Sequence, residues 1–201
     1  MKKILVAAVV AAGLITTGFT IAEVLPIGGI MPKSDLKLRD VSGSTITMAE
    51  VTKKNGVLVM FSCNTCPYVV KNQKRTVAIG GFAQKMGVGV IILNSNEALR
   101  SGDDSFEEMK SYAKQQKYNW SYAVDKNHEI ADAFGANRTP ECFLFDKNLK
   151  LVYHGAIDDN PSDESAVNQA HLKNAIEAVA NGKQVAIKET KSVGCAIKRN
   201  K

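Results

Sequence analysis

An apolar run followed by two closely spaced cysteines constrains the fold of this chain more than any other stretch. The run from Val57 to Phe61 predicts a strand that is covered on both faces. Cys63 and Cys66 follow it, and residues 69–86 then have the composition of a helix. A cysteine at a helix start meets the positive end of the helix dipole and unpaired N–H groups, which favour its thiolate. The pattern predicts a dithiol/disulfide centre, and the alternatives are a metal site and an inert structural pair.

Length and charge fit one globular domain. The chain has 201 residues, of which 45% are hydrophobic and 23% are charged, so it can bury a sizeable core. Its formal net charge is +6, and Lys2 and Lys3 account for two of these charges. The other lysines are scattered among acidic residues without a basic stripe or interleaved aromatic residues. This pattern argues against nucleic acid as a partner.

The first 22 residues have the pattern of a secretory signal peptide. A short basic start precedes an apolar core over residues 4–15, and small residues at Thr20 and Ala22 favour cleavage before Glu23. The alternative is an uncleaved anchor, because residues 4–22 are long enough to span a bilayer. We therefore expect a periplasmic or secreted protein that contacts the membrane only if this segment is retained. An oxidising compartment permits disulfides, so its cysteines should be paired or redox-active.

Strand and helix patterns alternate along the rest of the chain. Residues 23–35 contain two prolines and a Gly-Gly pair, which predict an extended lead-in. The expected strands are 36–40, 45–48, 57–61, 88–93, 121–124, 142–146 and 149–154. The expected helices are 69–86, softened at Gly80 and Gly81, then 103–113, 127–134 and 165–180. This order predicts one α/β domain over residues 23–182, with a central mixed sheet flanked by helices, an N-terminal β-hairpin and a tail over residues 183–201.

Several short motifs together resemble the thioredoxin superfamily, and within it a redoxin group described as alkyl hydroperoxide reductase/thiol-specific-antioxidant-like. The motifs are Cys63 to Val69, Asn94 to Asn96, Asp104 to Phe106, Thr139 to Glu141, Gly155 to Asn160 and Gly194 to Lys198. The resemblance implies a thioredoxin-like fold with a cis peptide bond before Pro140, which faces the cysteine pair. It also implies that backbone groups of Thr139 pair with an extended substrate strand.

The chain departs from two patterns of related families. Thioredoxins carry a tryptophan before the first cysteine, where this chain has Ser62, and a buried aspartate in the preceding strand, which is apolar here. Peroxiredoxins place a proline and a threonine upstream of the peroxide-reactive cysteine. Counted back from Cys63, these positions hold Gly56 and Met60, and a count from Cys66 finds neither residue. The usual peroxide-activating pocket is therefore not encoded.

We expect Cys63 to be the nucleophile, with an exposed sulfur and a lowered pKa. Cys66 is then the resolving thiol, which releases the substrate from a mixed disulfide. The expected pairing is Cys63 with Cys66, although four cysteines permit three pairings. The expected substrate-binding residues are Asn64, Thr65, Thr139 and Pro140.

The remaining candidates have structural and functional interpretations. Cys142 lies among apolar neighbours and is expected to be a small buried hydrophobe, with a third redox partner as the alternative. Cys195 follows a glycine in a polar tail, where it is an auxiliary resolving thiol, a structural partner of Cys142 or a free cysteine. His154 and His128 are candidates for a distant copper ligand, although packing or surface roles are expected for both.

Together these features predict an exported thiol–disulfide oxidoreductase without a cofactor or metal. Its partners would be protein or small-molecule disulfides and thiols, together with an electron donor. One alternative is an antioxidant peroxidase, in which Cys63 is oxidised to sulfenic acid and resolved by Cys66 or Cys195. The other is a carrier of copper or another soft metal on the same cysteines. The residues do not specify whether the protein acts as a reductant or an oxidant.

Overall fold

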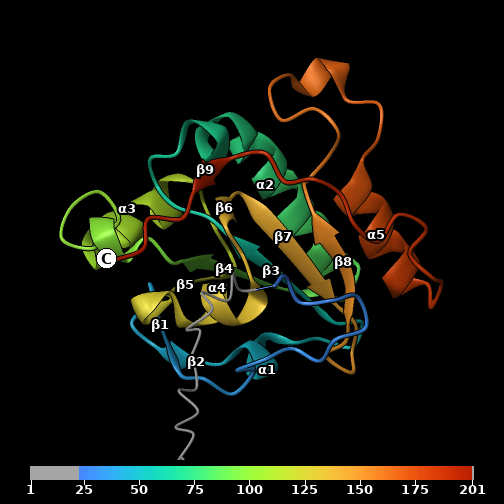
Figure 1. Cartoon of the computed structure of the whole chain (residues 1–201), viewed down its shortest axis with the longest axis horizontal. Helices are drawn as coiled ribbons and strands as arrows, with labels where there is room; N and C mark the ends of the chain where they lie inside the picture. Colours follow the sequence, from blue (N-terminus) through green and yellow to red (C-terminus); the bar gives the residue numbers. More distant parts are fainter. Residues whose placement is uncertain (1–22, 201) are drawn as a thin grey trace, which may run out of the picture.

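A seven-stranded mixed sheet forms the centre of the structure, a computed structural model that describes residues 23–200 (Figure 1). The predicted signal peptide, residues 1–22, lies outside the described residues. The strand order is β2-β1-β5-β4-β3-β7-β8, in which β3, β4 and β5 are parallel and the other neighbours are antiparallel. The strands are β1 Leu38–Asp40, β2 Thr45–Ile46, β3 Val57–Phe61, β4 Gly89–Asn94, β5 Ser121–Val124, β7 Glu141–Phe145 and β8 Leu151–Gly155. The predicted fold class is confirmed.

Helices cover both faces of this sheet, and a cluster of buried hydrophobic residues lies between the sheet and the helices on each face. One cluster joins the sheet to α2, α3 and α5, and the other joins it to α1, α4 and the N-terminal lead-in. The helices are α1 Met48–Val51, α2 Pro67–Lys85, α3 Phe106–Gln115, α4 Glu129–Phe134 and α5 His171–Ala180, with short 3₁₀ turns η1 Glu97–Leu99, η2 Lys126–His128 and η3 Glu164–Ala166. Within residues 23–200, no helix has the length and apolar character needed to cross a membrane.

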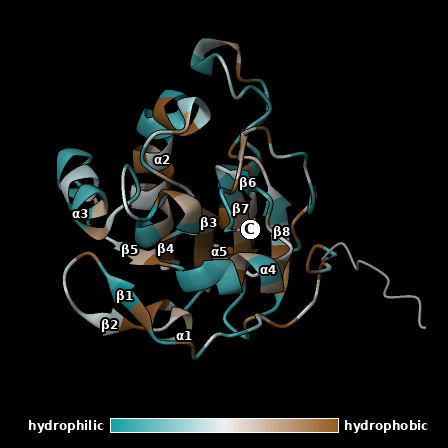
Figure 2. Ribbon diagram, turned by 60° about the vertical axis from the view of Figure 1, so that its left-hand side comes forward, coloured by the Kyte–Doolittle hydropathy of each residue, from teal (hydrophilic) through white to brown (hydrophobic). Residues whose placement is uncertain are grey.

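Strand β3 is uniformly apolar because its side chains enter both clusters. Leu58 and Met60 pack in the α2 layer, whereas Val57, Val59 and Phe61 pack in the α4 layer. Complete burial stabilises the fold by roughly 1.5–3 kcal/mol for each such side chain. Figure 2 shows the corresponding hydrophobic residues gathered along the central strands. The strand therefore fixes the point at which the chain leaves the sheet and turns into the cysteine loop.

Several predicted elements differ from the structure at their ends. The predicted helix 103–113 begins at Phe106, because Ser105 is its N-cap, and it extends to Gln115. The predicted strand 45–48 is wrong at Thr47 and Met48, because β2 ends at Ile46 and Thr47 is the N-cap of α1. Met48 begins that helix because Thr47 and Glu50 form a reciprocal capping box. The predicted helix 127–134 is interrupted at its start, where Asn127 and His128 have φ values of 54° and 48°. These left-handed conformations separate η2 from α4.

The predicted helix over residues 165–180 is wrong in its first part. Residues 167–170 lie between η3 and α5 because Asp159 binds this segment. Its Oδ1 accepts from the Asn168 N–H at 3.0 Å, and its own N–H donates to the Gln169 carbonyl at 3.1 Å. These contacts satisfy backbone groups that a helix would otherwise pair.

Gly80 and Gly81 lie inside an uninterrupted α2, so the predicted softening of this helix is wrong. The two neighbours have different surroundings. A Cβ on Gly80 would lie 2.7 Å from the Trp120 ring, whereas a Cβ on Gly81 would meet nothing within 4 Å.

Alanine substitutions at these two positions should therefore have opposite effects on stability. We expect Gly81→Ala to raise the free energy of unfolding by about 0.5–1 kcal/mol, because alanine is the better helix former. Gly80→Ala should lower it by about 1–3 kcal/mol, because the new methyl group overpacks the indole ring. Urea unfolding of the two variants measures both changes, and a shift in the same direction would contradict the packing described for Gly80.

Candidate functional site

The cysteine loop leaves the carboxyl end of β3 and enters α2. The Ser62 N–H donates to the Leu93 carbonyl at 2.9 Å, which extends the pairing with β4 by one residue. Cys66 is the N-cap residue of α2, and Pro67 occupies the first helical position. Cys66, rather than Cys63, therefore lies directly at the helix start. Cys63 lies in the loop, before the N-cap residue.

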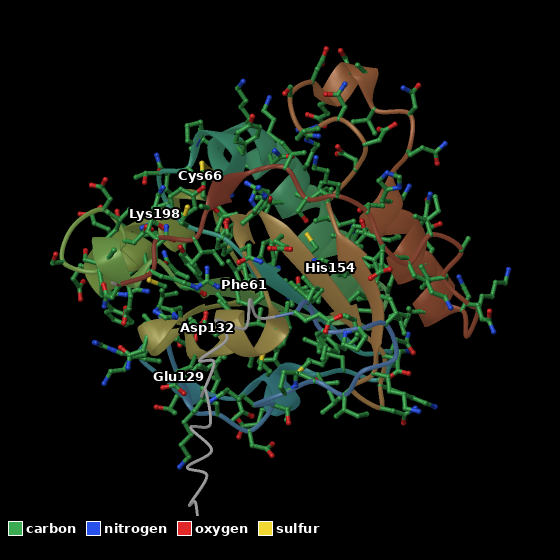
Figure 3. The ribbon with its side chains drawn as sticks, viewed as in Figure 1. Phe61, Cys66, Glu129, Asp132, His154 and Lys198 are labelled. Atoms are coloured by element: carbon green, nitrogen blue, oxygen red, sulfur yellow. A yellow bond between two sulfur atoms is a disulfide. The ribbon has the colours of Figure 1, made fainter. Side chains whose placement is uncertain are left out.

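Cys66 forms a disulfide with Cys195, so the predicted Cys63–Cys66 pairing is wrong for this form of the protein. The two residues are 129 positions apart in the sequence. They meet because strand β9, Cys195–Ala196, pairs with strand β6, Arg138–Thr139, with Cys195 opposite Thr139. Figure 3 shows Cys66 at the start of α2 where β9 passes. The predicted C-terminal tail thus contains a strand that supplies one sulfur of the centre.

Thr139 contacts the sulfurs of both loop cysteines. Its hydroxyl oxygen lies 3.5 Å from Cys63 Sγ, and its carbonyl oxygen lies 3.3 Å from Cys66 Sγ. The peptide bond between Thr139 and Pro140 is cis, as the family resemblance implied. Cys63, Cys66 and Cys195 pack together in one small cluster, in which Cys63 is a free thiol. The structure thus brings a free thiol and a disulfide to the same residue.

The expectation of an exposed, acidic Cys63 is wrong for this form. Cys63 is only 2% exposed, and burial raises the pKa of its thiol above the ordinary value. The negative charge of Asp104 raises this pKa further, whereas the Thr139 hydroxyl and the backbone N–H groups of Cys66 and Thr65 lower it. The N–H groups expected to favour a thiolate are therefore present, but burial outweighs them while the disulfide is closed.

The buried Asp104 carboxylate holds the cysteine loop in place by accepting hydrogen bonds, a role that the sequence did not indicate. Its Oδ1 accepts from the Asn64 N–H at 2.9 Å and from Asn94 Nδ2 at 2.7 Å, and its Oδ2 accepts from Asn96 Nδ2 at 2.9 Å. The Asn64 side chain accepts from the Tyr122 hydroxyl at 2.8 Å. These contacts hold Asn64 inward. The polar Asn94 to Asn96 run directly after a buried strand was the available sequence signal.

The other predicted residues lie at different depths. Thr65 is exposed at the loop tip, and Cys142 is fully buried in β7 opposite Met60. Burial raises the pKa of the Cys142 thiol strongly, which suits a small core residue. The disulfide between Cys66 and Cys195 removes the suggested pairing of Cys142 with Cys195.

The two histidines considered as copper ligands have carboxylate partners instead. His154 Nε2 lies 2.7 Å from Glu141 Oε1, and His128 Nδ1 lies 2.6 Å from Asp132 Oδ2. Across residues 23–200, no group of three histidine, cysteine, aspartate or glutamate side chains is arranged to hold a metal ion.

The Redoxin family model matches residues 27–171 of the chain. The protein belongs to the redoxin family. No curated protein matches the chain. A hypothetical protein from Sinorhizobium meliloti has a crystal structure that is similar to this redoxin, with 32% sequence identity and a TM-score of 0.80. The match covers 89% of this chain and 97% of that one.

More distant structures share the thioredoxin-like fold of this redoxin. A putative thiol:disulfide interchange protein DsbE from Chlorobium tepidum is 18% identical with a TM-score of 0.60, and the match covers 78% of this chain and 99% of that one. A mutant of PrxQ from Xylella fastidiosa is 13% identical with a TM-score of 0.56, covering 80% of this chain and 96% of that one. At such identities these two neighbours show the fold alone.

Proposed function

We propose that this redoxin is an exported thiol–disulfide oxidoreductase that uses Cys63, Cys66 and Cys195 together. The observation that carries the proposal is the free Cys63 thiol packed in one cluster with the Cys66–Cys195 disulfide. Export is supported by the signal-like pattern of residues 1–22 and is compatible with a disulfide, which an oxidising compartment preserves.

The first step is an exchange within the protein. The thiolate of Cys63 attacks Sγ of Cys66, so that a Cys63–Cys66 bond forms and the Cys66–Cys195 bond breaks. Cys195 leaves as a thiolate and takes up the proton that Cys63 gave up. No net oxidation occurs in this step, and the disulfide has moved from the C-terminal strand to the loop.

The second step exchanges the loop disulfide with an external partner. The thiolate of a substrate or donor attacks the Cys63–Cys66 disulfide and forms a mixed disulfide with one of its sulfurs. A second partner thiolate then attacks the partner's sulfur in this mixed disulfide, so that a partner disulfide forms and both loop cysteines are left as thiols. The reduced loop can reduce a substrate disulfide by the reverse sequence, in which the other loop thiol resolves the mixed disulfide. The Thr139 hydroxyl and the N–H groups of Thr65 and Cys66 stabilise a thiolate at Cys63 during these steps, because each favours the charged form.

Replacing Cys63 should abolish catalysed exchange while leaving the Cys66–Cys195 disulfide in place. We expect Cys63→Ser to lose at least about 100-fold in kcat/KM for reduction of a peptide disulfide by glutathione, because the attacking thiol is gone. Cys142→Ala is the matched control, since Cys142 is buried away from the centre, and should retain most of the activity.

Three results would contradict the proposal. One is equal activity of Cys63→Ser and the wild type. Another is the absence of any Cys63–Cys66 disulfide when peptides of the glutathione-equilibrated wild type are mapped by mass spectrometry. The third is a Cys63 thiol that hydrogen peroxide consumes much faster than disulfides do, which would favour the peroxidase alternative.

A further inference from the structure

The C-terminal strap, defined here as residues 192–199, contains β9, which lies beside β6 (Figure 1), and is bonded to the cysteine loop through Cys195. It pairs antiparallel with β6, with Ala196 opposite Arg138 and Cys195 opposite Thr139. In the part of the chain that the structure describes, β9 is the only strand paired with β6. Without the strap, the backbone groups of β6 would form an open strand edge next to Cys66.

The family resemblance already implies that Thr139 pairs with an extended substrate strand. We propose that in this protein the strap is the resident occupant of that β6 edge, and that the site selects an extended polypeptide segment with a glycine directly before its cysteine. The inference rests on the proposed thiol–disulfide function, because it names the substrate class of the same centre. The strap already has the geometry of a bound substrate: its backbone pairs with a strand edge, and its cysteine is bonded to a loop cysteine.

The residue before the cysteine must be glycine because its backbone lies too close to the backbone of Thr139 and Pro140 to leave room for a Cβ atom. A Cβ on Gly194 would overlap the Thr139 carbonyl oxygen and lie 3.2 Å from the Pro140 nitrogen. The Gly194 carbonyl in turn accepts from Arg138 Nη1 at 3.2 Å. Any larger residue at this position would push the bound strand away from β6 and from Cys66.

The residues after the cysteine are also recognised. Ile197 is 5% exposed and packs in the α4 layer, and its N–H donates to the Asn137 carbonyl at 3.0 Å. Arg199 Nε lies 2.8 Å from Asp132 Oδ1, and its Nη2 donates to the Ala136 carbonyl at 2.7 Å. The preferred segment is therefore glycine, cysteine, any residue, an apolar residue, any residue and arginine.

The disulfide controls whether the site is available. Upstream of the strap, Thr190 is fixed by a backbone bond to the His154 carbonyl and a hydroxyl contact with Tyr153. The Cys66–Cys195 bond ties the strap covalently to the cysteine loop, whereas its contacts with β6 are non-covalent, so the strap can separate from β6 once Cys195 is released. An incoming cysteine thiolate then attacks Sγ of Cys66 in the Cys63–Cys66 disulfide. The Cys66–substrate bond forms, and Cys63 leaves as a thiolate that takes up a proton.

The test uses the full-length Cys63→Ser/Cys195→Ser protein, which leaves Cys66 as the only thiol of the centre. The probe is a heptapeptide with the sequence of residues 193–199, activated as a mixed disulfide with nitrothiobenzoate. Attack by the Cys66 thiolate joins the peptide to the protein and releases coloured nitrothiobenzoate. We expect this peptide to react at least about tenfold faster than the same peptide with alanine in place of its glycine.

A loosened strap should admit the peptide faster. Adding Ile197→Ser to the same protein should increase the rate with the glycine peptide by about tenfold, because the competing strap loses its buried side chain. The rate with a small aromatic disulfide, which needs no strand pairing, should change much less. Arg199→Ala provides a second, milder loosening if Ile197→Ser unfolds the protein.

Equal rates for the glycine and alanine peptides would overturn the proposed site, as would rates that do not respond to either strap variant. Because the test protein lacks Cys63, these results are independent of the proposed catalytic exchange. If the wild type has no exchange activity but the test protein reacts faster with the glycine peptide than with the alanine peptide, the proposed function is contradicted and the proposed strand-binding site is supported.

Discussion

Replacing Asp104 with alanine should lower the free energy of unfolding by about 3–5 kcal/mol. The carboxylate is fully buried and accepts hydrogen bonds from the Asn64 backbone and from the side chains of Asn94 and Asn96. Its removal leaves buried donors without partners, each of which costs about 1–3 kcal/mol. Urea unfolding at neutral pH measures the loss.

Asp103→Ala is the matched control for this prediction. Asp103 precedes Asp104 directly, but it is exposed, and only its backbone carbonyl contacts the cysteine loop, through Asn64 Nδ2. Its substitution should change the free energy of unfolding by less than about 0.5 kcal/mol. Equal effects of the two variants would show that the buried network is not the source of the stability.

The conservative variant Asp104→Asn has a second readout at Cys63. The negative charge of Asp104 contributes to the raised pKa of the Cys63 thiol, after the larger effect of burial. Removing the charge should therefore lower this pKa, so that the thiolate forms at lower pH. The ultraviolet absorbance of the thiolate, compared with that of Cys63→Ser, follows the titration. A pKa that is unchanged or higher would contradict the assigned electrostatic contact.

Breaking the Cys66–Cys195 disulfide should also have a large effect on stability. The bond closes a loop with a sequence separation of 129, for which the chain-entropy model gives about 5 kcal/mol, and native disulfides typically contribute about 2–5 kcal/mol. We expect Cys195→Ser to lower the free energy of unfolding within this range. The comparison is urea unfolding with and without a reducing agent.

The reducing agent provides an internal control. It should destabilise the wild type by about as much as Cys195→Ser does, and it should have no further effect on that variant. Cys142→Ala retains the disulfide, so reduction should still destabilise it. If oxidised wild type and Cys195→Ser unfold at the same urea concentration, the bond does not stabilise the protein as described.

Both predictions concern segments that the fold brings to the cysteine loop from elsewhere in the chain. Asp104 comes from the segment before α3, and Cys195 comes from the C-terminal strap. The loop itself supplies only Cys63 and Cys66. The chemistry available at Cys63 therefore depends on packing between distant segments more than on the two residues that separate the loop cysteines.

The sequence alone determined the framework of this protein. The apolar run Val57 to Phe61 predicts both ends of β3, because every residue of that strand is buried. Residues 121–124 predict both ends of β5, in which the two central residues are buried. The family motifs indicated the cis bond before Pro140 and placed both loop cysteines near one end of the sheet.

Only the tertiary structure decided which cysteines are joined and how acidic Cys63 is. The partner of Cys66 depends on the register between β9 and β6, and no local pattern encodes a pairing across such a sequence separation. The pKa of Cys63 depends on burial and on Asp104, both of which arise when remote segments close over the loop. Local composition fixes strands and helices, whereas solvent exclusion and pairing are properties of the assembled chain.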